Sequence, residues 1–286
     1  MMTRMSERTR SAMGHRRRWS LIAMYACAVV LVLWSVTPII WMALSSLKVS
    51  TNMFSMPPQF IFKPELGTYV YMFTQAGFGK FLVNSLVASL SSTLIALFLG
   101  SLGGYALSRG RFKHHKDISF WIISTRMAPI PAVILPLYLI FSRLRMVGTM
   151  PGLIFAYITF NLPFALWMMM AFFADVPAAL EEAARVDGTS KFGAFLRIAL
   201  PAASPGLAAT GVLCMMFAWN DYVFASALTS AHTQTVPIAA SLLVTQTGIA
   251  WGQAMSTGTI IVMPMLLCGF LMRKYLVKGF SMGAVK

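Results

Sequence analysis

The sequence predicts an all-α protein that crosses a membrane six times. Of its 286 residues, 58% are hydrophobic and only 11% are charged, and the mean hydropathy is +0.72. Soluble domains carry about 25% charged residues, so this composition is typical of a polytopic membrane protein. A helix of about 20 apolar residues can cross a bilayer. Runs of this kind occupy residues 19–44, 81–107, 118–141, 151–173, 205–228 and 253–272.

The first predicted span follows a basic tail, residues 1–18, which contains six arginines. No small-residue cleavage site follows at a signal-peptide distance, so we expect the span to be retained. Pro38 predicts a kink near its outer end. The segment 48–79 is rich in proline and aromatic residues, and we expect it to be irregular and to pack over the outer ends of the spans.

Small residues in the second span and prolines in the third predict how these two spans pack and where they break. Glycines near the end of the second span permit close approach of another helix; they are Gly100, Gly103 and Gly104. The third span holds Pro129, Pro131 and Pro136. Each proline removes a backbone hydrogen bond that lipid cannot replace. We therefore expect the third span to be broken and to face protein or a cavity at the break.

The distribution of basic residues predicts the orientation in the membrane. Seventeen of the 23 Lys and Arg residues fall in four segments assigned to one side, 1–18, 108–117, 174–200 and 272–286. Positive residues concentrate in cytoplasmic loops, so both termini are expected in the cytoplasm. The net charge of +15 then reflects topology and not nucleic-acid binding. Arg143 and Arg145 lie on the disfavoured side, and the sequence offers no account of them.

A polar segment, residues 175–201, separates the fourth and fifth spans and contains Glu181, Glu182 and Asp187. Its pattern predicts two short amphipathic helices. Asp175 is expected to cap the first and Gly188 to end it in the left-handed conformation, with Thr189 or Ser190 capping a second that ends before Pro201. Phe192, Phe195, Leu196 and Ala199 would share one side of that second helix. Helices this short need a surface to pack on, which could be protein or lipid headgroups.

The same segment resembles the signature loop of the membrane subunits of bacterial ABC importers. The match consists of Glu182-Ala183-Ala184, then Gly188, then Ile198-x-Leu200-Pro201 at the family's spacing. In that family the loop forms coupling helices that dock on a cytoplasmic ATP-binding subunit. The resemblance implies a coupling role for Glu181, Glu182, Ala183, Ala184, Arg185, Asp187, Gly188, Ile198, Leu200 and Pro201.

Further motifs resemble the sugar-importing branch, in particular the smaller, maltose-permease-like member of its two permease subunits. They are Trp219-Asn220-Asp221, Pro136-Leu137-Tyr138 and the ending Tyr275-Leu276-Val277-Lys278-Gly279 with Gly283-Ala284-Val285-Lys286. The resemblance implies import of a mono-, di- or oligosaccharide or a polyol across the bacterial cytoplasmic membrane. It implies a permease domain at 19–273 with cytoplasmic tails at 1–18 and 274–286. Its partners would be a second permease, two ATP-binding subunits that hold ATP and Mg, and a periplasmic or lipid-anchored binding protein; this chain would hold no cofactor.

Five residues are candidates for the substrate path: Trp219, Asn220, Asp221, Asn84 and Asn161. Trp219 could stack on a sugar ring. A charge inside a span is energetically costly, so Asp221 is a candidate for a functional role. The alternatives are an interfacial anchor and hydrogen bonds between helices. Arg126 could snorkel to the cytoplasmic interface, which we favour, or face the break near Pro129. A difference in depth of about 12 Å argues against an ion pair between Arg126 and Asp221.

Other classes of function lack the residues they need. The sequence contains no phosphate-binding glycine loop, no metal-type spacing of its three cysteines and no catalytic cluster, so an enzyme is not expected. The adjacent His114 and His115 would point about 100° apart on a helix, which suits a solvated surface. An ion-coupled secondary transporter remains the alternative. It is disfavoured because acidic residues in the middle of a span are nearly absent.

Overall fold

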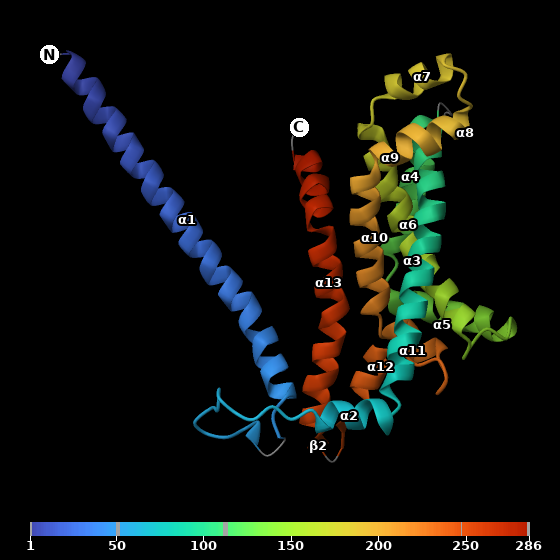
Figure 1. Ribbon diagram of the computed structural model, residues 1–286. Helices are drawn as coiled ribbons and strands as arrows, with labels where there is room; N and C mark the ends of the chain where they lie inside the picture. The colour runs from blue at the N-terminus through green and yellow to red at the C-terminus, as the bar shows by residue number, and fades with distance from the viewer. Residues whose placement is uncertain (1, 50–51, 111–113, 247, 285–286) are drawn as a thin grey trace. The chain divides into compact units, whose positions relative to one another are not determined.

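The computed structural model describes residues 2–49, 52–110, 114–246 and 248–284, and their side chains except for 2–18, 116 and 271–284. The described chain is helical almost throughout, which confirms the predicted all-α class (Figure 1). Two short strands, β1 (Val244–Thr245) and β2 (Gly248–Ile249), form an antiparallel pair in which Val244 lies opposite Ile249. The helices divide into two compact units.

Within the described residues, four helices are long and apolar enough to cross a membrane. They are α1 (Met2–Ser46), α3 (Phe78–Arg109), α6 (Met150–Asp175) and α13 (Trp251–Ala284). Two bent helix pairs raise the number to six. One pair joins α4 (His115–Ser124) and the turn η2 (Thr125–Met127) to α5 (Ile130–Arg143), with a bend of 95°. The other joins residues 191–202 to α10 (Ser204–Trp219), with a bend of 75°.

The first unit comprises Met1–Tyr69 and Trp251–Thr259. In it the ammonium of Lys48 lies over the rings of Trp41 and Phe62, at 5.0 and 5.2 Å from their centroids, and the side chain is buried. The Ser46 hydroxyl lies 2.7 Å from the Tyr69 hydroxyl. The prediction that 48–79 is irregular was partly wrong, because this segment contains α2 (Gly67–Thr74) and the start of α3.

The second unit, Val70–Ala250 with Ile260–Lys286, is built on α3, α6 and α10, which lie side by side (Figure 1). The glycines of α3 allow the close approach to α6 that the sequence predicts. A Cβ on Gly104 would lie 2.7 Å from the Met170 backbone nitrogen and 2.9 Å from the Leu166 carbonyl oxygen. Atoms at that separation clash, so only glycine permits this crossing.

The third span breaks where its prolines predict. Pro129 has extended backbone angles, φ −64° and ψ 132°, and the chain turns there between η2 and α5. At the far end of α5, Arg145 adopts a left-handed φ of 55°. The Arg145 and Met146 amides donate to the carbonyls of Ser142 and Phe141, so Arg145 stops the helix.

The fifth span is shorter than predicted, because α10 ends at Trp219 and a separate helix, α11 (Val223–Leu228), follows. The Asn220 side chain donates to the Met216 carbonyl, while the Asp221 carboxylate accepts from the amides of Phe224 and Ala225. Asn and Asp side chains compete in this way with helical hydrogen bonds, so the chain breaks between them. The next helix is α12 (Val236–Ser241).

Candidate functional site

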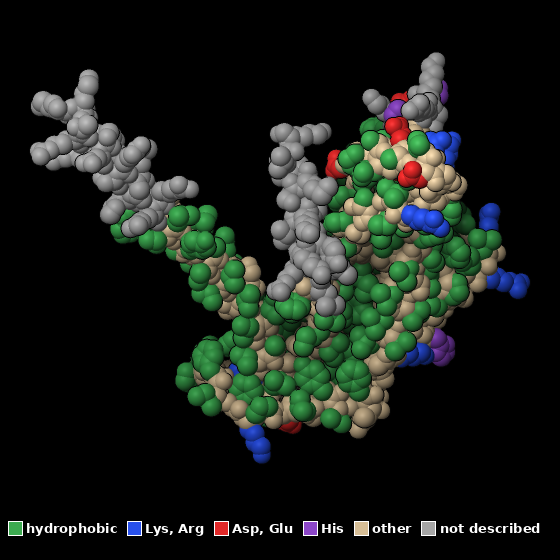
Figure 2. All heavy atoms as spheres, turned by 45° about the horizontal axis from the view of Figure 1, so that its top comes forward, with side chains coloured by type: hydrophobic (Ala, Val, Ile, Leu, Met, Phe, Trp, Pro, Cys, Tyr) green, Lys and Arg blue, Asp and Glu red, His purple; other side chains and the backbone are tan. Residues whose placement is uncertain are grey.

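The polar segment 175–201, which we call the coupling segment, lies at the end of the second unit that carries α7 (Ala178–Val186). In Figure 2 most of the visible acidic side chains gather at that end, while hydrophobic side chains cover the flanks of the helices. The prediction that Asp175 caps α7 was wrong. Asp175 is the last residue of α6, and Pro177 occupies the cap position without a side-chain hydrogen bond.

Gly188 ends α7 as predicted. Its φ is 90°, in the left-handed region, and its amide donates to the Arg185 carbonyl while the Thr189 amide donates to that of Ala184. This pair of bonds satisfies the last carbonyls of the helix and requires a left-handed residue at position 188. A Cβ at Gly188 would meet no atom within 4 Å, so the elbow is open to the surroundings.

The second arm consists of α8 (Lys191–Ala194), a π-helical turn η3 (Phe195–Ala199) and α9 (Leu200–Ala202). Ser190 caps it by accepting from the Gly193 amide at 3.1 Å, as predicted. The prediction that the arm ends before Pro201 was wrong. The Leu200 amide donates to the Phe195 carbonyl within the π turn, and Pro201 falls in the first turn of α9, where a missing N–H is tolerated.

The coupling segment packs on protein through a small core under its second arm. Phe195, Ala199 and Ala203 are buried with Phe173 and Val176. This packing confirms the expectation that helices this short need a surface. The predicted apolar side is only half correct, since Phe192 and Leu196 are 62% and 45% exposed. The buried side of the arm is instead formed by Ala194, Phe195 and Ala199.

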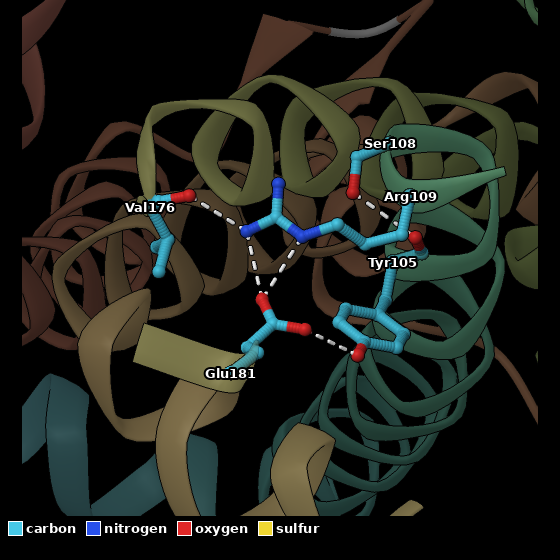
Figure 3. A network of polar contacts seen from close by, with 5 residues as sticks. All are labelled: Tyr105, Ser108, Arg109, Val176 and Glu181. Carbon is cyan, nitrogen blue, oxygen red and sulfur yellow. Dashed lines mark hydrogen bonds and ion pairs between the residues drawn. The ribbon is translucent and has the colours of Figure 1, made fainter. Parts of the chain in front are cut away.

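Glu181 ties α7 to the end of α3 (Figure 3). The Arg109 guanidinium donates to its Oε1 through Nε and Nη2 at 2.9 and 2.8 Å, and the Tyr105 hydroxyl donates to its Oε2 at 2.6 Å. Arg109 Nη2 also donates to the Val176 carbonyl at 2.7 Å, just before α7 begins. Glu181 is only 7% exposed. Both of its carboxylate oxygens are therefore occupied inside this chain.

The other predicted coupling residues lie at least partly on the surface. Glu182, Ala183, Arg185, Asp187, Gly188 and Pro201 are exposed, and Ala184, Ile198 and Leu200 are partly exposed. Sequence reasoning missed Val186, which is 87% exposed beside them. Glu181 alone among the ten turns its charge away from this surface. The segment thus presents two carboxylates, a guanidinium and the exposed Val186 on one surface.

The predicted substrate-path residues do not form one group. Trp219 is 1% exposed and its indole donates to the Ile261 carbonyl at 3.1 Å, so it offers no ring face to a sugar. Asn84 donates to the carbonyls of His232 and Gln234. Asn161 is buried and donates to the Cys214 carbonyl at 3.1 Å. These contacts match the alternative in which asparagines join helices and loops.

A cavity of about 350 Å³ opens at the break of the third span, and we call it the third-span cavity. Its polar wall is formed by Thr125, Arg126, Thr159 and Asp221, and its apolar wall includes Phe160, Phe217 and Phe224. Asp221 lines the cavity, whereas the neighbouring Asn220 does not, and its side chain donates to the Met216 carbonyl of its own helix. The sequence favoured snorkelling of Arg126 to the cytoplasmic interface, and this expectation was wrong, because Arg126 lines the cavity. Its guanidinium carbon lies over the rings of Phe164 and Phe217, at 4.8 and 4.7 Å from their centroids, and the two rings are nearly perpendicular to each other.

The described residues thus form up to six helical spans, with an exposed and charged helix pair between the fourth and the fifth. Residues 96–282 match the family of binding-protein-dependent transport system inner membrane components. The chain is 32% identical to the inner membrane ABC transporter permease protein YcjP of Escherichia coli, over 95% of this chain and 99% of that one. It is 31% identical to the trehalose/maltose transport system permease protein MalG of Thermococcus litoralis, over 91% and 94%.

Among solved structures, a bacterial ABC transporter involved in the import of the acidic polysaccharide alginate shares the fold. Its TM-score is 0.76 at 19% identity, covering 90% of this chain and 96% of that one. The chain therefore belongs to the inner-membrane permease subunits of binding-protein-dependent ABC transporters. It is a transport subunit and not an enzyme. In the part of the chain that the structure describes, no group of His, Cys, Asp or Glu could hold a metal ion.

Proposed function

We propose that this chain is the smaller of two permease subunits in an importer that carries a sugar or polyol across the bacterial inner membrane. The transporter would also contain two ATP-binding subunits, which hold ATP and Mg, and a periplasmic or lipid-anchored binding protein. Residues 19–273 would form the membrane domain, with the tails 1–18 and 274–286 and the coupling segment in the cytoplasm. Family membership counts against the ion-coupled alternative.

The single observation that supports coupling is the two-sided construction of α7. Its inner side is fixed to α3 through Glu181 and Arg109, while Glu182, Arg185 and Asp187 are exposed on the coupling segment. A partner bound to the exposed residues would move α7, and the partly buried ion pair would pass that motion to the C-terminal end of α3. ATP binding and hydrolysis on the partner would thereby change the arrangement of the spans.

The substrate class rests on the printed names of relatives. A trehalose/maltose permease is similar over nearly the whole chain, and an alginate importer shares the fold. Both names describe carriers of saccharides of different size and charge. We therefore propose a carbohydrate or polyol as the substrate class and leave its length open. Competition of labelled sugars and polyols for uptake identifies the member of the class.

Site-directed crosslinking tests the coupling proposal. In cells that make the whole transporter and with the native cysteines of this chain replaced, a maleimide–benzophenone reagent attached to Asp187→Cys should crosslink to the ATP-binding subunit on irradiation. Ser226→Cys serves as the matched control, because Ser226 is equally exposed but lies on α11, at the other end of the second unit from α7 (Figure 1). It should react with maleimide and give no adduct with that subunit. Labelling of Asp187→Cys without any such adduct would contradict the proposed docking.

A further inference from the structure

The third-span cavity is built by parts of the chain that lie far apart in sequence. The break between η2 and α5 supplies Arg126, α6 supplies Thr159 and Phe160, and the end of α10 with α11 supplies Phe217, Asp221 and Phe224. Its volume of about 350 Å³ lies within the range of small-molecule sites. All of these residues belong to the second unit.

Arg126 brings an unpaired cation to the wall of this cavity. Within the described residues its guanidinium takes part in no hydrogen bond and no ion pair, and its contacts are the faces of Phe164 and Phe217. The faces of both rings attract the charge of the guanidinium. Its N–H groups remain available as hydrogen-bond donors. A cation within a span is energetically costly, and hydrogen bonds from its N–H groups to acceptors reduce that cost.

Acceptors line the same cavity. The Asp221 carboxylate lines the cavity and caps α11 through the Ala225 amide at 3.0 Å and the Phe224 amide at 3.4 Å, which fixes its position. The Thr159 hydroxyl donates to the Ala156 carbonyl at 2.6 Å, so its oxygen can only accept from a ligand. Asp221 and Arg126 form no ion pair with each other. The cavity therefore offers one donor group and separate acceptors.

The apolar wall offers flat surfaces. Phe160 and Phe224 are stacked, with centroids 5.4 Å apart and planes inclined by 18°. A sugar ring carries hydroxyls that both donate and accept, and C–H groups that pack on aromatic faces. An apolar ligand would leave Arg126 without acceptors, and a simple anion would meet the charge of Asp221. A hydroxylated ring satisfies the donor, the acceptors and the aromatic wall together.

We propose that this subunit itself holds a saccharide subsite in the third-span cavity, with Arg126 as the donor that determines specificity for a ring hydroxyl. This inference rests on the proposed function, because it presumes that a carbohydrate passes through the transporter. It locates substrate contacts in this chain and not solely in the second permease. Phenylalanines that line the cavity would take the stacking role that the sequence suggested for Trp219.

The test is equilibrium binding of labelled sugar to the detergent-solubilised complex of both permeases and the ATP-binding subunits, without the binding protein. The sugar is the best substrate from an uptake panel of mono- and disaccharides and polyols. Arg126→Met should raise the dissociation constant about 10- to 100-fold, the range for hydrogen bonds to a charged group. Arg126→Lys should recover part of the loss. Arg143→Met is the control, because Arg143 is exposed on α5 and lies outside the cavity wall.

Monodeoxy analogues of the sugar separate recognition from a general loss of structure. If Arg126 bonds one hydroxyl, the analogue lacking that hydroxyl should bind wild type and Arg126→Met equally, while the other analogues keep the difference. Sugar binding that is unaffected by Arg126→Met, or an equal loss for every analogue, would overturn the subsite. Absence of uptake for every carbohydrate in wild-type cells would instead refute the proposed substrate class, so the two failures are distinguishable.

Discussion

Glu181 and Glu182 are neighbours in α7, but one side chain is buried and the other is exposed, so the two have different roles. The first is buried against Arg109 and Tyr105, and the second is exposed. Sequence reasoning gave both the same coupling role. It could not separate them, because the partner that turns Glu181 inward lies 72 residues earlier, and no local pattern reveals that contact.

Replacing Glu181 by Gln should loosen α7 without unfolding the spans. Gln keeps the shape but loses the charge, and it leaves Arg109 beside a weaker acceptor. Hydrogen bonds to charged groups contribute about 1.5–3 kcal/mol, and the partial exposure of Arg109 favours the lower end. Hydrogen exchange of the α7 amides should therefore accelerate about 10-fold in the assembled transporter.

Glu182→Gln is the matched control for that measurement. Its side chain is exposed and makes no hydrogen bond or ion pair within the described residues, so α7 exchange should stay close to wild type. Equal acceleration in both variants would mean that the Arg109 contact does not hold the helix. The two variants also distinguish the contact of α7 with α3 from the contact with a partner, because only the side chain of Glu182 is exposed.

At the scale of elements, the elbow at Gly188 decides how the two arms of the coupling segment are set. Its left-handed φ of 90° is a conformation that a β-branched residue adopts only with strain of about 1–2 kcal/mol. The predicted stop was correct because a glycine after an amphipathic run is a strong local signal. The π turn and the passage of the second arm through Pro201 had no such signal, since both depend on the core beneath Phe195 and Ala199.

Gly188→Val should leave membrane insertion intact and reduce transport per ATP hydrolysed. The added side chain meets no neighbour in this chain, so any loss comes from the strained elbow and from the partner it faces. The measurement is the ratio of sugar uptake to ATP turnover in proteoliposomes. Gly188→Asn is the control, because Asn tolerates the left-handed region and should retain more coupling than Val. Wild-type coupling in the Val variant would exclude a fixed elbow.

At the scale of the whole molecule, the spans could be predicted because length and hydropathy are properties of contiguous residues. The break in the third span followed from its prolines. The break at Asn220 and Asp221 was missed, since their helix-ending role requires side chains to bond to nearby backbone in preference to continuing the helix. The sequence predicted that the third span faces protein or a cavity at its break, but it could not predict which residues line the third-span cavity. Thr125, Thr159 and Phe217 come from separate spans, and one sequence does not reveal which spans meet.

Orientation is a property of the whole chain, because no single loop decides it. Seventeen basic residues on one side against five on the other predict that the coupling segment faces the cytoplasm and that the segment containing Glu65 faces outward. With the native cysteines replaced, Glu65→Cys should react with a membrane-impermeant maleimide in intact spheroplasts. Asp187→Cys should react only after the membrane is opened. Both positions are exposed, so burial does not explain a difference. The reverse pattern would place α7 outside the cell, where no ATP-binding subunit could reach it.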